Sequence, residues 1–356
     1  MKSSKYLPFC FLIVLASLAP PLSAQSSESA EPSDSIAGSV IFQRPETVDS
    51  RFFTLTFEND AFVGEDDGFT NGLGLTYGRG PFTSFSPDNI PGVLHWLAKK
   101  TYISRPNKIK GIAYHLGQFI QTPKDITIAE PQPNDIPWAG LLSLQTTLYS
   151  WDRNASDQLS FSFGVVGPLS FADEAQTIVH EIIGADEPLG WDNQLDNELV
   201  FSVSATRNQK FYTRYGSKYG LDVIGLGQAG VGTILSSVGG GLAVRFGTNM
   251  EFSHATFDLL PDRQVNSLAL APTNDFYTYI GASGTYVFND VLLDGNTFED
   301  SVSAPLENAQ NLATIGLVAK YGRFAYVFQL SSFSSRTEFS SDREKLGALS
   351  FTVAFE

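Results

Sequence analysis

Apolar and polar residues alternate along most of the chain, in segments of about ten residues that are separated by turn-forming residues. In the segment that contains Leu159, Phe161 and Phe163, for example, every second residue is apolar. Such alternation is typical of strands with one apolar face and one polar or small-residue face. It predicts twelve strands, near residues 52–60, 70–79, 111–121, 139–150, 157–166, 198–206, 219–228, 238–247, 275–288, 311–321, 324–332 and 346–355.

The length, number and faces of these strands favour an outer-membrane barrel. Strands of such barrels are about ten residues long, are even in number and turn apolar side chains outward. A soluble β-sandwich has shorter strands and a drier second face. The last strand places Leu349, Phe351 and Val353 on one face, although the chain ends on Glu356 rather than on an aromatic residue. We therefore predict an all-β fold, a 12-stranded antiparallel transmembrane β-barrel over residues 51–356.

The connections between strands differ at the two ends of this barrel. If both chain ends lie in the periplasm, the connections near 59–70, 118–140 and 167–197 are extracellular. These three have an unusual polar composition, and their meeting at one mouth is what a functional site requires. The stretch 80–110 falls on the periplasmic side, where turns are normally short. Its prolines and glycines predict an ordered loop with a short helix at 93–100.

The N-terminal region stands apart from the barrel. Residues 1–24 have the basic start, short apolar core and small-residue cleavage site of a signal peptide. The segment 25–50 is rich in Ser, Glu and Pro, and we expect it to be flexible. The only cysteine, Cys10, lies in the signal peptide, which excludes thiol catalysis and zinc–thiolate sites in the mature chain.

Composition excludes several other classes of function. The formal net charge of -15 argues against nucleic acid as a partner, because phosphate binding needs basic residues. After the signal peptide the chain contains no eighteen consecutive apolar residues, so no transmembrane helix is predicted. The Gly-x-Ser-x-Gly motif of a nucleophile elbow and the His-Glu-x-x-His motif of a zinc protease are both missing.

The first extracellular connection brings together carboxylate, amide and hydroxyl groups. Their residues are Glu58, Asn59, Asp60, Thr70 and Asn71. These groups are suited to bind a hard cation or to position a water molecule. A polar hairpin loop with Asx-turns is the alternative. Asn59, Asp60 and Thr70 are our site candidates, and we expect Glu58 and Asn71, with the following glycine, to shape the turn.

The third extracellular connection contains the most convincing helix, from Ser170 to Gly184. We expect Ser170 to cap this helix and Gly184 to end it. Gln176 and His180 are four residues apart and share a helix face. A histidine paired with an amide is a candidate general base, and a surface histidine without a task is the alternative. The following segment, 186–198, offers carboxylates and amides for cation or headgroup contact, or forms a Trp-anchored interface loop.

Three other histidines lack comparable neighbours, and we assign them structural roles: His95, His115 and His254.

These motifs, in this order, resemble the outer-membrane lipid A 3′-O-deacylase family. The resemblance covers the chain from about Arg51 to Glu356. The matching motifs are Glu58-Asn59-Asp60, Thr70-Asn71-Gly72, Gln118 with Thr122-Pro123, Ala139-Gly140, Gly164 to Pro168, Gln176 to His180, and Gly190-Trp191-Asp192 with Gln194.

The resemblance implies a twelve-stranded barrel that hydrolyses the ester at the lipid A 3′ position and depends on Ca²⁺. It implies that His180 activates the water and that Asn59, Asp60 and Thr70 are polar site residues. Asp60 is the first candidate for a calcium contact, and Asp186 is a weaker one. Whether the acidic cluster 65–67 joins the calcium site or is solvated stays open.

Two departures from the family pattern concern positive charge. Relatives often have Asp-Arg-Pro-Tyr-Ala-Gly in the second extracellular connection, where this chain has isoleucine at the arginine position, Ile136. A lysine that acts in some members has no clear match; Ile128 stands about there, and Lys124 is the nearest basic residue. Both losses remove charge that would contact lipid phosphates, so they put the exact substrate in doubt more than the chemistry.

Three functions remain open from the sequence. The first is a calcium-dependent lipid A esterase that acts on lipopolysaccharide in the outer-membrane bilayer, as a monomer with its site facing outward. The second is a non-catalytic barrel, a channel or a structural protein. The third is an esterase that acts on another envelope lipid.

Overall fold

A computed structural model describes residues 50–59, 69–260 and 275–355 of the 356-residue chain. All of them belong to one compact unit, Glu46–Glu356. The predicted signal peptide and the predicted flexible segment up to residue 49 lie outside the described residues. So do the candidate Asp60 and the acidic cluster 65–67.

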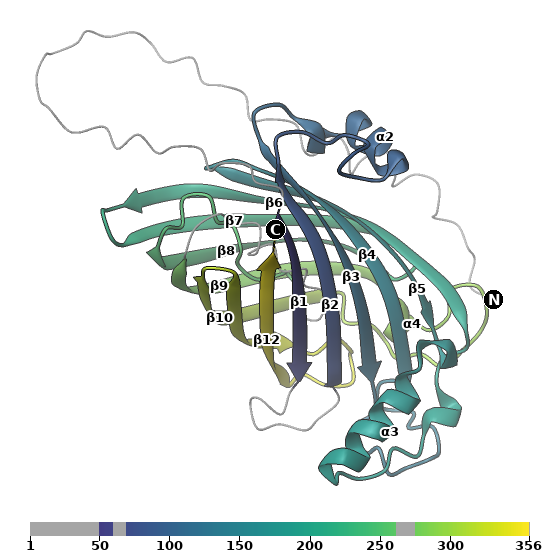
Figure 1. Ribbon diagram of the computed structural model, residues 1–356. Coiled ribbons are helices and arrows are strands. Elements are labelled where there is room, and N and C mark those ends of the chain that lie inside the picture. Colours follow the sequence, from purple (N-terminus) through teal and green to yellow (C-terminus); the bar gives the residue numbers. More distant parts are fainter. Residues whose placement is uncertain (1–49, 60–68, 261–274, 356) are drawn as a thin grey trace, which may run out of the picture. The chain divides into compact units, whose positions relative to one another are not determined.

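The described residues form twelve strands that close into one antiparallel barrel (Figure 1). Each strand pairs with its neighbours in the sequence, and β1 pairs with β12 to complete the ring. The strands are β1 Ser50–Asn59, β2 Phe69–Phe82, β3 Ile109–Gln121, β4 Ala139–Trp151, β5 Ala155–Val166, β6 Glu198–Tyr215, β7 Gly220–Gly232, β8 Leu235–Thr248, β9 Phe276–Asp290, β10 Ala309–Tyr321, β11 Phe324–Ser334 and β12 Arg343–Phe355. The predicted 12-stranded antiparallel barrel is confirmed.

Within residues 50–59, 69–260 and 275–355, helices occur in three connections. The β2–β3 connection holds α2 Gly92–Lys100 and the 3₁₀ turn η2 Tyr102–Ser104, and the β9–β10 connection holds α4 Val291–Asp294. The β5–β6 connection holds η3 Pro168–Ser170, α3 Ala172–Ile183 and η4 Trp191–Asn193. Both predicted helices, at 93–100 and 170–184, are therefore confirmed. None of the described helices is long and apolar enough to cross a membrane.

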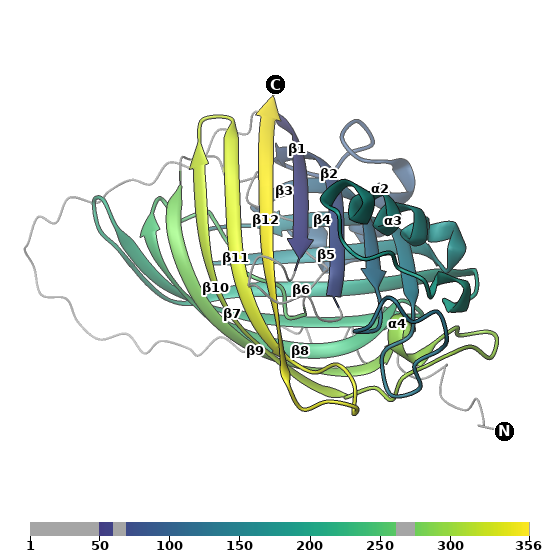
Figure 2. The ribbon, with the colours of Figure 1, turned by 90° about the horizontal axis from the view of Figure 1, so that it is seen from below.

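The two ends of the barrel carry different elements. Strand β1 runs toward the end that carries α3 and α4, and α2 belongs to the opposite end (Figures 1 and 2). We call these the α3 end and the α2 end.

The period-two pattern of the sequence separates an apolar outer face from a polar inner one. Five apolar side chains face each other across β1 to β5 on the outside: Leu55, Leu75, Leu116, Leu144 and Phe163. They are between 48% and 66% exposed. A continuous exposed apolar band of this kind is stabilised by lipid rather than by water.

The inner face is built of small and polar side chains. On β1 and β12, the hydroxyls of Thr54 and Thr352 lie 2.6 Å apart, and those of Thr56 and Ser350 lie 3.0 Å apart. All four residues are buried. Hydrogen bonds between neighbouring strands therefore satisfy polar groups inside the lumen that a soluble sandwich would replace with apolar side chains.

At the α2 end, the start of the β8–β9 connection folds into the lumen. Phe257 stacks on Tyr279 of β9, with ring centroids 6.5 Å apart. The carbonyl oxygen of Leu259 accepts hydrogen bonds from Ser283 Oγ at 3.2 Å and Thr285 Oγ1 at 3.4 Å. We call residues 249–260 the inner plug.

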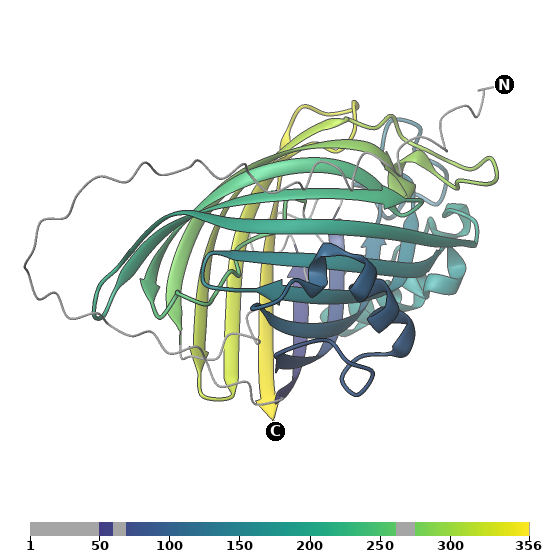
Figure 3. The ribbon, with the colours of Figure 1, turned by 90° about the horizontal axis from the view of Figure 1, so that it is seen from above.

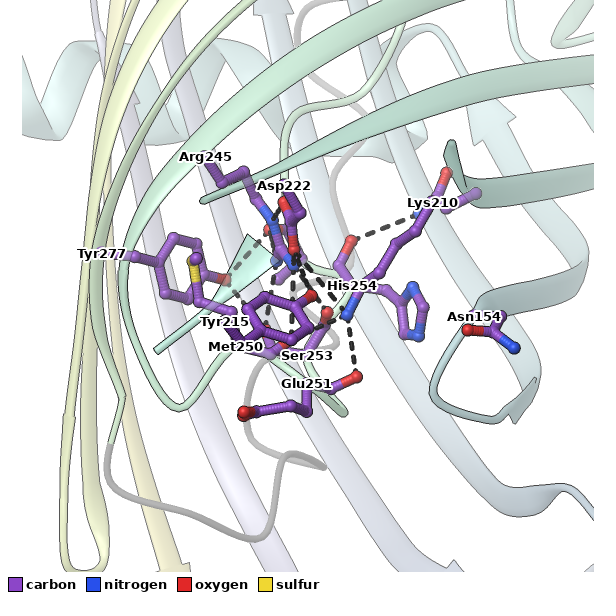
Figure 4. A network of polar contacts seen from close by, with 12 residues as sticks. Asn154, Lys210, Tyr215, Asp222, Arg245, Met250, Glu251, Ser253, His254 and Tyr277 are labelled. Atoms are coloured by element: carbon purple, nitrogen blue, oxygen red, sulfur yellow. Dashed lines mark hydrogen bonds and ion pairs between the residues drawn. The ribbon is translucent and has the colours of Figure 1, made fainter. Parts of the chain in front are cut away.

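An ion pair between β7 and β8 holds the inner plug (Figure 4). Arg245 of β8 donates to both carboxylate oxygens of Asp222 on β7, at 2.9 Å and 2.7 Å. The same guanidinium donates to the carbonyl oxygens of Ser253 at 2.9 Å and Ala255 at 3.2 Å. Bidentate pairing fixes the guanidinium plane, so the remaining N–H groups point at the plug backbone.

Two further side chains complete this network. Lys210 Nζ of β6 donates to the carbonyl oxygens of Met250 at 2.7 Å and Glu251 at 2.8 Å. The Nε2 atom of the buried His254 lies 2.7 Å from the Asp152 carbonyl oxygen, so it must carry a proton. Burial, followed by the charge of Lys210, lowers the pKa of His254 and keeps its ring neutral. The structural role assigned to His254 agrees with these contacts.

Candidate active site at the α3 end

The start of α3 lies against the barrel wall because Gly140 leaves room for it. A Cβ atom at Gly140 of β4 would overlap Ser170 Oγ and Ala172 Cβ. Next to this contact, Gln118 Nε2 of β3 donates to the carbonyl oxygens of Ser170 at 2.7 Å and Phe171 at 3.0 Å. The Gln118 and Ala139-Gly140 motifs thus fix the position of one helix.

The N-terminus of α3 differs from the expectation. Ser170 does not cap the helix: it belongs to η3 and is fully buried. Phe171 takes the N-cap position in a left-handed conformation, with φ of 57°, which is uncommon for a residue with a side chain. The capping prediction is wrong: Ser170 packs against Gly140 of β4, and the N-cap position lies one residue later, at Phe171. Gly184 does end the helix, with φ of 73° and its N–H bonded to the His180 carbonyl oxygen at 2.8 Å.

An aromatic cluster fixes the middle of α3. Trp138 and Trp191 meet edge to face, with centroids 5.1 Å apart, and pack with Ile120 and Ala172. A side chain at position 190 would collide with the Trp138 ring, which accounts for the glycine of the Gly190-Trp191 motif. The return segment of this connection is therefore built around two tryptophans rather than left as a surface loop.

Gln176 is part of this cluster and is 2% exposed. Its Oε1 atom accepts a hydrogen bond from Trp191 Nε1 at 2.8 Å. An indole nitrogen only donates, so this bond also settles which end of the amide is oxygen. Gln176 Nε2 is buried and has no hydrogen-bond partner among the described residues. Trp191, which the sequence gave as part of the Gly190-Trp191-Asp192 motif but not as a partner of Gln176, is thus the residue that orients Gln176.

His180 lies in the last turn of α3, partly exposed, and is oriented by the backbone. Its Nδ1 atom lies 2.6 Å from the carbonyl oxygen of Asp186. A carbonyl oxygen can only accept, so the proton of the neutral ring is on Nδ1 and the Nε2 lone pair is available. This is the tautomer that a general base requires. The orienting partner is the Asp186 carbonyl, and the Asp186 side chain is exposed.

The first hairpin ends at the same end of the barrel as α3 (Figure 1). Asn59 is the last residue of β1, half-buried and opposite Gly347. Thr70 lies in β2, where the register with β3 shifts between Phe69 and Asn71. Asp60 follows Asn59 directly and lies outside the described residues.

Glu58 was expected to shape this turn, and that expectation is wrong. Glu58 pairs with Gly72 of the Thr70-Asn71-Gly72 motif in the β1–β2 ladder, so both residues belong to strands. The Glu58 side chain is buried in the lumen, where it lines a cavity with about 1180 Å³ of empty space, part of it open to solvent. His115 lines the same cavity, and its Nδ1 atom lies 2.9 Å from Thr76 Oγ1. His95 lies on α2, away from the α3 end.

The described residues do not by themselves form a metal site. Within 50–59, 69–260 and 275–355, no group of three or more His, Cys, Asp or Glu side chains is placed to hold a metal ion. Asp186 is the only candidate metal ligand from the sequence that falls in these ranges. The acidic side chains within these ranges therefore do not by themselves make up a calcium site, which takes six to eight oxygen ligands.

Comparison with known proteins places this geometry in context. Residues 9–355 match the family model described as "Outer membrane protein LpxR". Among solved structures, LpxR from Salmonella typhimurium is similar over 85% of this chain and 99% of its own, with 18% identity and a TM-score of 0.69. The β domain of the Bordetella autotransporter BrkA covers 86% of this chain and 98% of its own, with 9% identity and a TM-score of 0.40. The sequence matches none of the curated proteins.

Proposed function

Because the chain belongs to the LpxR family of outer-membrane proteins, we propose that it is an ester hydrolase acting on lipid A. In this proposal the α3 end faces outward, and the 3′-linked acyloxyacyl group of lipid A is removed in the outer leaflet. The observation that carries the proposal is the hydrogen bond between His180 Nδ1 and the Asp186 carbonyl oxygen, which leaves Nε2 as a base.

The reaction needs one base and no covalent enzyme intermediate. His180 Nε2 takes a proton from water while the water oxygen attacks the ester carbonyl carbon. When the carbon–oxygen ester bond breaks, the same proton passes to the departing sugar oxygen. The products are a carboxylic acid and a free hydroxyl.

Asn59 and Thr70 complete the site in this proposal. An amide N–H and a hydroxyl O–H can both donate to the carbonyl oxygen as negative charge develops on it. Gln176 acts as a positioning residue, because its contact with Trp191 fixes the helix that carries His180.

We further propose that activity depends on Ca²⁺, with Asp60 and Asp186 as ligand candidates. This part rests on the family resemblance. The described residues contain no cluster of three or more His, Cys, Asp or Glu side chains that would place the ion, and the mechanism above does not pass through it.

The test is expression in an enteric host, followed by mass spectrometry of lipid A. We expect loss of a mass that matches the 3′ acyl groups. His180→Ala should reduce this loss by roughly 10² to 10⁴-fold, the usual contribution of a general base. Glu181→Gln, the exposed neighbour on α3, is the matched control and should retain activity. With purified protein, a chelator should abolish activity, and added Ca²⁺ should restore it.

Two outcomes would support the alternatives. Fatty acid released from phospholipid, with lipid A unchanged, would indicate an esterase for another envelope lipid. Unchanged lipids with well-folded barrel in the outer membrane would refute the enzyme and favour a non-catalytic barrel.

A further inference from the structure

The β2–β3 connection, which carries α2, packs on the outer wall of the barrel (Figure 3). Ile90, Ala98 and Ile103 of this connection are buried in one cluster with Ile112, Leu148 and Leu159 of β3 to β5. These three strand residues face one another across β3, β4 and β5. They lie on the outward face, four residues along each strand from Leu116, Leu144 and Phe163 of the exposed apolar band. The connection therefore covers wall that would otherwise contact lipid.

Polar contacts hold the connection in place. Lys110 Nζ of β3 donates to the carbonyl oxygens of Ile103 at 3.0 Å and Arg105 at 2.7 Å. Tyr102 Oη donates to the Gln158 carbonyl oxygen at 2.8 Å, and Lys108 pairs with the buried Asp157 at 2.7 Å. With these contacts, α2 has a fixed orientation relative to the wall.

This orientation leaves a distinct outer surface. Val93 is 66% exposed and Trp96 60% exposed, and Lys99 and Lys100 in the last turn are exposed as well. Tryptophan is favoured at the boundary of a bilayer, and lysine side chains extend from apolar surroundings toward phosphate groups. Two adjacent exposed lysines form a local positive charge that is complementary to an anionic surface.

We propose that α2 is an interfacial anchor. Val93 and Trp96 enter the boundary between headgroups and acyl chains in the leaflet at the α2 end. Lys99 and Lys100 contact the phosphates of anionic glycerophospholipids there. With the orientation proposed above, this is the inner leaflet. The connection that carries this surface packs on the strand residues that continue the apolar band of the barrel wall, which is why lipid is its occupant.

Trp96 is a reporter for this contact, because the other tryptophans, Trp138, Trp151 and Trp191, are only 2% to 5% exposed. The folded chain would be reconstituted in vesicles of phosphatidylcholine and phosphatidylglycerol whose acyl chains are brominated near the headgroup. The fluorescence of Trp96 is the difference in tryptophan emission between the wild-type protein and Trp96→Phe. This difference should be largely quenched in brominated vesicles. Acrylamide in the water should leave it nearly unchanged. Phe163→Trp in the Trp96→Phe background is the positive control for lipid contact.

The headgroup contact has its own test. Lys99→Gln with Lys100→Gln should reduce quenching in phosphatidylglycerol vesicles to the level found in pure phosphatidylcholine. Lys218→Gln, an exposed lysine on the β6–β7 turn at the same end, should change nothing. Quenching of Trp96 by acrylamide but not by brominated lipid would refute the anchor. Protection from both quenchers would also refute it, because a protein surface would then cover α2. Equal quenching of Trp96 by brominated lipid in phosphatidylglycerol vesicles and in pure phosphatidylcholine vesicles would refute the phosphate contact.

Discussion

At the scale of single residues, the main finding is how His180 is oriented. The sequence placed an amide, Gln176, on the same helix face, and that spacing is observed. Gln176 instead bonds Trp191, and His180 bonds the Asp186 carbonyl. Spacing along a helix predicts which side chains share a face. It does not predict a backbone carbonyl that a turn brings back toward the histidine.

The carbonyl of Asp186 contacts His180, and its carboxylate is a proposed calcium ligand; Asp186→Asn separates the two. The substitution keeps the backbone carbonyl that holds His180 and removes the negative charge. We expect activity at saturating Ca²⁺ to stay close to that of the wild-type protein. The Ca²⁺ concentration for half activity should rise several-fold, because the affinity of calcium sites follows the number of charged ligands. A calcium titration with purified protein measures both quantities.

An unchanged calcium dependence would remove Asp186 from the ligand set. A large loss at saturating Ca²⁺ would mean that the carboxylate itself takes part in the reaction.

At the scale of elements, the sequence predicted all twelve strands, but it did not predict the ends of every strand. Strand β6 was predicted to end near residue 206 and extends to Tyr215. Its last part loses the alternation because Arg207 and Lys210 are there, and both form ion pairs that are visible only in three dimensions. The start of α3 was misplaced for a similar reason, since contact with Gly140 overrides the local capping preference of Ser170.

The position of α3 can be changed without touching the reacting groups. Gly140→Ala would introduce a Cβ into the contact with Ser170 and Ala172. Overpacking of this kind costs about 1–3 kcal/mol, and here it should be relieved by moving α3 away from the wall. We expect a well-folded barrel with strongly reduced deacylation, measured by lipid A mass spectrometry.

Gly227→Ala is the matched control for this variant. Gly227 lies on β7, and an added Cβ would have no atom within 4 Å. Equal activity of the two variants would show that the site does not depend on the close contact between α3 and β4.

At the scale of the whole barrel, the inner plug bears on the channel hypothesis. The sequence assigned His254 a structural role but gave no sign that the β8–β9 connection folds inward. The plug is held by residues from three strands, Lys210, Asp222 and Arg245. They lie on the successive strands β6, β7 and β8, and each taken alone looks like an ordinary polar lumen residue. A barrel whose lumen is occupied at the α2 end in this way is suited to carry a site at the α3 end rather than to conduct ions.

The last prediction therefore concerns the effect of Arg245→Ala on the inner plug. Removing the guanidinium leaves Asp222 buried without its bidentate partner and releases the plug carbonyls at Ser253 and Ala255. Breaking a buried pair from one side costs about 3–5 kcal/mol, so the plug should loosen while the barrel hydrogen bonds remain. In planar bilayers we expect no steady ion current through the wild-type protein and a measurable current through the variant. Arg343→Ala, which loses bonds to Ser332 and Asn311 on the exposed surface, should behave like the wild type. A steady current through the wild-type protein would instead favour the channel, because it would mean that the inner plug does not seal the lumen.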